Sequence, residues 1–197
     1  MQKIILIGAG GHAKSCIDVI ESTKKYKIVG LIDNNKKIGE KVFNYKIIGN
    51  DNDLNQISKK YKNLHCHISI GTITNQGLRE KIFSNLKKKK LIFPLIKSNK
   101  SIISKYAKIG EGTIIMHNAV VNAGSVIGKN CIINTKSLIE HDAIIDDHSQ
   151  ISTGTIINST VRIGKKCFIG SNSVIKQTVK IRNNSFVNMG SVIFKDV

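Results

Sequence analysis

The stretch that decides the fold is IGEGTIIMHNAVVNAGSVI, residues 109–127, in which every sixth residue is aliphatic. The series continues in both directions without an insertion. Its members are Ile103, Ile109, Ile115, Val121, Ile127, Ile133, Ile139, Ile145, Ile151, Ile157, Ile163, Ile169, Ile175, Ile181, Val187 and Ile193. This period matches neither the roughly 3.6-residue turn of an α-helix nor the turn spacing of about 8 to 12 residues in a β-sandwich. The repeat therefore indicates short strands stacked in coils.

A smaller side chain lies two positions before each aliphatic residue. These side chains are Ser101, Ala107, Thr113, Ala119, Ser125, Cys131, Ser137, Ala143, Ser149, Thr155, Val161, Cys167, Ser173, Val179, Ser185 and Ser191. Residues two apart on a strand share a face, so each hexad sends one large and one small group into a narrow interior. Gly, Asn or Asp commonly follows the aliphatic residue, where we expect the chain to turn, as at Gly110, Asn122, Gly128, Asn134, Asp146, Asn158, Gly164 and Gly170. Three hexads then make one coil of a triangular prism.

This arrangement resembles the left-handed parallel β-helix of hexapeptide-repeat acyltransferases, which we expect from about Ser101 onward. Residues three hexads apart would stack on successive coils, about 4.8 Å apart. Cys131 and Cys167 would then lie two coils apart, too far for a disulfide. Cys16 and Cys66 likewise belong to no CxxC motif, so we expect four reduced and mostly buried thiols.

The composition is that of a folded globular protein, with 41% hydrophobic and 22% charged residues. There is no apolar run of about 18 residues, and the N-terminal apolar stretch is too short for a signal peptide, so we expect a cytoplasmic protein without membrane contact. The net charge of +18 raises the alternative of a nucleic-acid-binding protein. No aromatic residues interleave with the one dense run, Lys87 to Lys90, so we favour anionic small substrates such as nucleotide sugars or coenzyme A.

The N-terminal third begins with a strand, a glycine turn and a helix. A predicted strand at Lys3 to Ile7 runs into Gly8-Ala9-Gly10-Gly11-His12-Ala13 and then into an apparent helix. Glycines at such a turn let the backbone approach a phosphate, and the helix N-terminus supplies oriented N–H groups. Asp33 ends a second strand, Lys27 to Ile32, at a spacing suited to a ribose hydroxyl. Taken alone this is a loose dinucleotide fingerprint, and an NAD-linked role stays open.

The rest of the N-terminal third continues the alternation. We expect a third strand near His65 to Ser69 that closes with Ile70-Gly71-Thr72, a helix from Asn75 to Leu86, and a strand at Leu91 to Leu95. Residues 1–95 should therefore form a small Rossmann-like parallel-sheet domain, and residues 96–197 the β-helix. The predicted fold class is α/β plus all-β.

The densest polar group among the hexads is Glu140-His141-Asp142, followed by Asp146-Asp147-His148. A corner residue of the prism faces outward, and a carboxylate beside His141 can hold one ring nitrogen and leave the other to accept a proton. A zinc site of three histidines is an alternative. His117 and His141 are one coil plus one face apart, however, and so point in different directions within a subunit. We therefore predict no metal, unless subunits share a site.

The segments GAGGHAK at Gly8 to Lys14, Asp33, Ile70-Gly71 and Glu140-His141-Asp142 resemble the NeuD/PglD-type sugar acetyltransferases of bacterial glycan biosynthesis, and the similarity spans nearly the whole chain. The resemblance implies a homotrimer that binds acetyl-CoA between neighbouring β-helices. It implies that the N-terminal domain binds a nucleotide-activated amino sugar, of the UDP-4-amino-4,6-dideoxy type, for N-acetylation. O-acetylation of sialic acid or another sugar is the alternative within the family.

The resemblance also assigns roles by matched position. It implies that His141 is the catalytic base and that Asp142 strengthens it. The residues matched to the nucleotide-sugar site are Gly10, Gly11, His12, Asp33, Asn34 and Gly71. Those matched to the acetyl-CoA site are Gln150, Ser171 and Met189. Gln150 stands where the family often has a histidine, and its amide can still donate a hydrogen bond. The sequence ends at Lys195-Asp196-Val197 without the family's usual Pro-Ala element, so a non-catalytic nucleotide- or NAD-binding homologue is the alternative of another class.

Overall fold

The computed structural model describes residues 1–61, 63–71, 76–89 and 91–197. Thr72, Asn75 and Lys90, which belong to segments discussed above, lie outside the described residues. The chain forms two compact units. The first contains Met1–Gly71 and Lys81–Pro94, and the second contains Thr72–Glu80 and Leu95–Val197.

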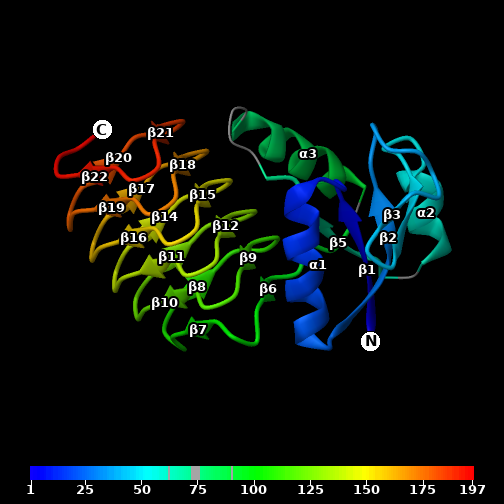
Figure 1. Cartoon of the computed structure of the whole chain (residues 1–197), viewed down its shortest axis with the longest axis horizontal. Helices are drawn as coiled ribbons and strands as arrows, with labels where there is room; N and C mark the ends of the chain where they lie inside the picture. The colour runs from blue at the N-terminus through cyan, green and yellow to red at the C-terminus, as the bar shows by residue number, and fades with distance from the viewer. Residues whose placement is uncertain (62, 72–75, 90) are drawn as a thin grey trace. The chain divides into compact units, whose positions relative to one another are not determined.

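The first unit is built on a five-stranded sheet (Figure 1). Its strands are β1 (Gln2–Ile7), β2 (Tyr26–Ile32), β3 (Lys41–Val42), β4 (Tyr45–Gly49) and β5 (His65–Ile68). The helices of the chain are α1 (Gly11–Thr23), α2 (Leu54–Lys60) and α3 (Gln76–Lys88). The strand order is β3-β4-β2-β1-β5, and the last four strands are parallel. The predicted Rossmann-like sheet is confirmed, and the structure adds an antiparallel edge pair, β3 with β4.

Buried apolar residues explain the central elements of this unit. The inner residues of β1 and β2 are almost all buried, as in parallel strands covered on both faces. On α1 one stripe is buried, formed by Ala13, Cys16, Ile17, Val19 and Ile20. The strand predicted at Leu91 to Leu95 is wrong, because only Ile92 pairs, in a single bridge with His65. Pro94 has no N–H to donate, so a regular ladder cannot continue there.

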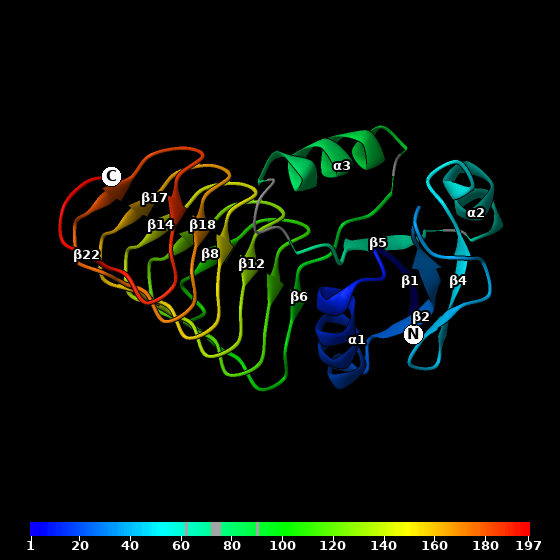
Figure 2. The same cartoon turned by 45° about the horizontal axis from the view of Figure 1, so that its top comes forward.

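The second unit contains a left-handed β-helix of two-residue strands (Figure 2). The strands are β6 (Ile96–Lys97), β7 (Ile102–Ile103), β8 (Lys108–Ile109), β9 (Ile114–Ile115), β10 (Val120–Val121), β11 (Val126–Ile127), β12 (Ile132–Ile133), β13 (Leu138–Ile139), β14 (Ile144–Ile145), β15 (Gln150–Ile151), β16 (Ile156–Ile157), β17 (Arg162–Ile163), β18 (Phe168–Ile169), β19 (Val174–Ile175), β20 (Lys180–Ile181), β21 (Phe186–Val187) and β22 (Val192–Ile193). They form three parallel sheets: sheet I (β6, β9, β12, β15, β18, β21), sheet II (β7, β10, β13, β16, β19, β22) and sheet III (β8, β11, β14, β17, β20).

The register confirms three hexads per coil. Val121 pairs with Ile139, and Ile139 pairs with Ile157, so each strand stacks on the strand three hexads later. Both members of the repeat fill the interior: from Ile115 to Val187 the aliphatic residues are at most 4% exposed. The four cysteines form no disulfide and are buried. None of the helices in the described parts of the chain is long and apolar enough to cross a membrane.

Turns join the sheets along three corners. Corner I–II contains residues 116–118, 134–136, 152–154, 170–172 and 188–190, corner II–III contains 122–124, 140–142, 158–160 and 176–178, and corner III–I contains 110–112, 128–130, 146–148, 164–166 and 182–184. The chain turns after the aliphatic residue, as predicted, and from Ile109 to Val187 the residue with positive φ is the third after it, as at Asn118, Gly124 and Asp142. Where glycine occupies the first position, close approach of the next coil is the reason. A Cβ on Gly110 would lie 2.7 Å from the carbonyl carbon of Gly128 in the next coil.

Candidate active site

His141 and Asp142 form a hydrogen-bonded pair on corner II–III, between β13 and β14. Nδ1 of His141 lies 2.9 Å from Oδ2 of Asp142, and the two side chains are 58% and 60% exposed. Glu140 does not hold the ring, because its Oε2 accepts the backbone N–H of His141 at 3.2 Å. When Nδ1–H is donated to Asp142, the lone pair of the neutral ring is on Nε2. The pair can therefore take a proton from a bound nucleophile.

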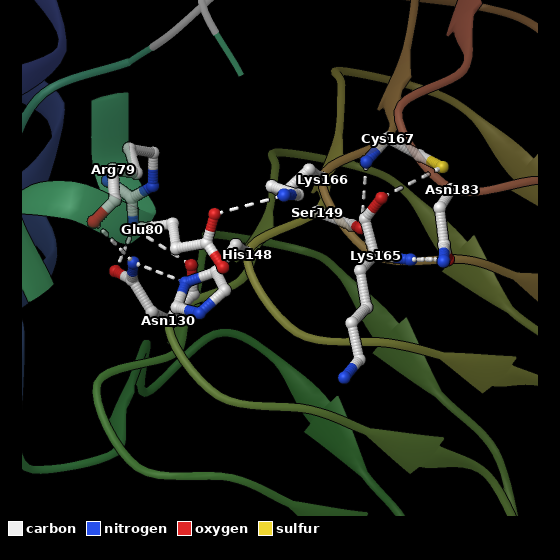
Figure 3. A network of polar contacts seen from close by, with 9 residues as sticks. All are labelled: Arg79, Glu80, Asn130, His148, Ser149, Lys165, Lys166, Cys167 and Asn183. Carbon is white, nitrogen blue, oxygen red and sulfur yellow. Dashed lines mark hydrogen bonds and ion pairs between the residues drawn. The ribbon is translucent and has the colours of Figure 1, made fainter. Parts of the chain in front are cut away.

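His148 is close to His141 in sequence but lies on another corner, III–I. Figure 3 shows its ring beside Asn130 and Arg79. Its Nδ1 is 2.9 Å from Nδ2 of Asn130, which also donates to the backbone carbonyl of Arg79 at 3.2 Å. Arg79 in turn donates to Oδ1 of Asn130 at 2.6 Å. Because Nδ2 of Asn130 is a donor, Nδ1 of His148 accepts and the ring is neutral; burial lowers the pKa of His148. The two histidines therefore do not share one site within a chain.

Arg79 was missed by sequence reasoning. It is 1% exposed, although it lies in the first turn of α3, a helix that looks exposed from its sequence. Its neighbour Glu80 forms an ion pair with Lys166 at 3.0 Å (Figure 3). Asn130, His148 and Lys166 are three hexads apart on one corner, and this spacing is the sequence signal that groups them. No trio of His, Cys, Asp or Glu that could hold a metal ion occurs within the described ranges.

The residues matched to the acetyl-CoA site follow corner I–II and its border with sheet I. Ser171 and Met189 occupy the same corner position in successive coils, where the N–H of Gly190 donates to the Ser171 carbonyl at 2.8 Å. Met189 is 80% exposed. Gln150 precedes this corner on β15, and its Nε2 reaches Oγ of Ser152 at 3.5 Å. Within one chain the structure does not bring these residues to His141, which is on the next corner.

An aromatic pair beside these residues was also missed. Phe168 and Phe186 stack on sheet I, with ring centroids 4.9 Å apart and planes at 10°. Phe168 pairs in register with Gln150. Both lie at the position before the aliphatic residue, which the hexad pattern leaves free to vary.

The residues matched to the nucleotide-sugar site gather at one edge of the sheet in the first unit. β1, β2 and β5 are parallel neighbours, so the loops after Ile7, Ile32 and Ile68 emerge at the same edge. These loops and the start of α1 carry the matched residues Gly10, Gly11, His12, Asp33, Asn34 and Gly71. Such an edge, at the carboxyl ends of parallel strands, is where α/β sheets bind ligands.

Asp33 holds the glycine loop in place. Its Oδ2 accepts the N–H of Ala9 at 2.8 Å, and its Oδ1 accepts the N–H of Asn35 at 2.8 Å. Gly10 and Gly11 are exposed at the start of α1, where free helical N–H groups favour anions.

His12 and Asn34 complete this edge. Gly71 packs on His12, because a Cβ at Gly71 would lie 3.3 Å from Cβ of His12. Asn34 instead pairs with Asp51, to which its Nδ2 donates at 2.9 Å. The edge therefore offers N–H donors and one engaged carboxylate to a phosphorylated ligand.

Comparison with known proteins agrees with this two-part architecture. Residues 3–86 match the PglD N-terminal domain family, and residues 97–196, just over half of the chain, match the GMPPB C-terminal domain family. A sequence search of curated proteins finds no match.

Solved structures match over the full chain. The acetyltransferase domain of PglB from Neisseria gonorrhoeae FA1090 is 27% identical, with a TM-score of 0.91 over 100% of this chain and 93% of that chain. Its complex with acetyl coenzyme A has a TM-score of 0.90, with 27% identity over 100% and 92% of the two chains. A mutant of perosamine N-acetyltransferase from Caulobacter crescentus, in complex with CoA and GDP-perosamine, is 22% identical with a TM-score of 0.94 over 100% and 90%.

Proposed function

We propose that this chain transfers acetyl from acetyl-CoA to the amino group of a nucleotide-activated amino sugar. The chain belongs to the NeuD/PglD-type sugar acetyltransferases, and its β-helix belongs to the GMPPB C-terminal domain family. The observation that carries the proposal is the exposed His141–Asp142 pair, 2.9 Å apart. The PglB acetyltransferase domain with acetyl coenzyme A supports the donor, and the complex with GDP-perosamine agrees with the class of acceptor. The product would serve bacterial surface glycan synthesis in the cytoplasm.

The proposed step is direct transfer. The sugar amine attacks the thioester carbonyl carbon, a C–N bond forms and the C–S bond breaks. His141 Nε2 takes the proton that the amine loses, and coenzyme A leaves as a thiolate that solvent protonates. Asp142 accepts Nδ1–H throughout, which keeps the lone pair on Nε2 and stabilises the imidazolium.

A homotrimer would complete the site. The outward residues of sheet II are all aliphatic and stay half-buried or exposed in one chain: Ile102, Val120, Leu138, Ile156, Val174 and Val192. An uninterrupted apolar face of this kind is typical of a subunit interface. Sheet II lies between corners I–II and II–III. If three copies turn this face to a common axis, Ser171 and Met189 of one copy lie beside His141 of the next.

The acceptor would bind in the first unit. Its phosphates would meet the N–H groups at Gly10 and Gly11, at the start of α1. The loop that carries them is fixed by Asp33 through Ala9.

A substrate screen tests the proposal. Thiol release from acetyl-CoA is measured with a UDP-4-amino-4,6-dideoxy sugar, with GDP-perosamine and with sialic acid. Turnover with an amino sugar, lowered by about 10²- to 10⁴-fold in His141→Ala, is the expected result. Turnover with sialic acid alone would move the reaction to O-acetylation, and no turnover with any acceptor would contradict the proposal. Light scattering should give three times the chain mass of 21.7 kDa.

A further inference from the structure

We infer that Gly124 is a positioning residue for the His141–Asp142 pair, because its lack of a side chain leaves the space that the Asp142 carboxylate occupies. The role in turnover rests on the proposed function, whereas the role in geometry does not. Gly124 holds the same place on corner II–III as Asp142, one coil earlier.

The two residues are in direct contact. A Cβ on Gly124 would overlap Oδ1 of Asp142 and would lie 3.2 Å from its Cγ. The other oxygen, Oδ2, is the one that accepts from Nδ1 of His141. A carboxylate is planar and rigid, so anything that displaces Oδ1 also displaces Oδ2. The ring of His141 would then lose its partner.

The backbone of Asp142 cannot absorb the displacement. Its φ is 59°, and its N–H donates to the Ala123 carbonyl at 3.0 Å. Its strand neighbours in β14 are paired on both sides, with β11 and with β17. Relief must therefore come from rotation of the side chain, away from His141.

The backbone conformation alone does not explain the glycine. Gly124 has φ +74°, but the equivalent positions on this corner in the later coils are Asp142, Thr160 and Thr178, with φ of 59°, 59° and 67°. Side chains are therefore accommodated at this turn.

Similar packing of a glycine against an Asn or Asp oxygen occurs elsewhere in the β-helix. On corner I–II, a Cβ on Gly154 would overlap Oδ1 of Asn172. In both places the glycine leaves space for the Asn or Asp side chain of the next coil and packs directly against it. At Gly124 the held group is the carboxylate bound to His141, and this gives the glycine its place in the proposed reaction.

Gly124→Ala is the test, with Gly112→Ala as the matched control. Gly112 has φ 72° but lies on corner III–I, so it carries the same backbone strain without contact to the pair. We expect Gly124→Ala to lower kcat at least tenfold with little change in KM, and Gly112→Ala to leave kcat unchanged. In an Asp142→Ala background, adding Gly124→Ala should lower kcat no further. An additive loss, or unchanged kcat in the single variant, would overturn the inference.

A second readout does not depend on activity. In protein labelled with ¹⁵N-histidine, the ring nitrogen shifts report which nitrogen carries the proton. We expect Nδ1–H for neutral His141 in the wild type and in Gly112→Ala, and a shift toward Nε2–H in Gly124→Ala. An unchanged tautomer in Gly124→Ala would overturn the inference. If the wild type transfers no acetyl group, the proposed function fails, and the tautomer still decides the role of Gly124.

Discussion

Truncation of one interior isoleucine should measure how much the β-helix depends on its hexads. Ile151 on β15 is 0% exposed and pairs with Ile133 in the coil before it and Ile169 in the coil after it. Ile151→Ala removes three buried carbon atoms. At about 0.8 kcal/mol each, their transfer to water costs about 2.4 kcal/mol. The stacked coils cannot close the cavity, which raises the expected loss of unfolding free energy to about 3–4 kcal/mol.

The same substitution on the outer surface is the control. Ile144 on β14 points outward from sheet III and is only half-buried, so Ile144→Ala should cost less than about 1 kcal/mol. Urea unfolding followed by circular dichroism gives both values when the slope is unchanged. Equal losses in the two variants, or a loss below about 1 kcal/mol in Ile151→Ala, would refute the assignment of the aliphatic series to the interior.

Three further predictions address the assembly, the nucleotide edge and pH. Leu138→Glu puts a charge on the apolar face of sheet II and should give monomers in light scattering; an intact trimer would move the interface elsewhere. Asp33→Ala releases the Ala9 N–H and should weaken nucleotide-sugar binding at least tenfold by calorimetry without affecting acetyl-CoA, and equal weakening of both would contradict this. Burial lowers the pKa of His148 in the native state, so below about pH 6.5 the unfolded state binds a proton that the native state does not. The free energy of unfolding should therefore fall as the pH drops below that value, and it should fall less in His148→Gln. Parallel curves of unfolding free energy against pH for the two proteins would contradict this.

The β-helix was predictable because its interior is too narrow to tolerate exceptions. Every sixth residue must be aliphatic and the residue two before it small, and from Thr113 to Ile181 both sets are buried in the structure. The part of the chain between Asp33 and His65 gave no such signal. β3 is two residues long, and α2 has a single buried residue, Leu54, so neither carries a hydrophobic period.

The candidate site was predictable only in part. His141 and Asp142 stand together in the sequence, and the structure joins them. His148 follows only seven residues after His141, yet it lies on another corner of the prism, because neighbours in space are three hexads apart. Nothing in the sequence pattern indicates that Arg79 is buried, since a charged residue on an amphipathic helix normally faces water. Contacts between different coils follow the period of the fold and not the distance along the chain.

The most direct test of the central claim is the turnover number of His141→Asn with acetyl-CoA and the accepted nucleotide amino sugar. We predict a fall in kcat of about 10²- to 10⁴-fold, the usual contribution of a general base, with an unchanged circular dichroism spectrum and KM values close to those of the wild type. Turnover within a few-fold of the wild type would contradict the account.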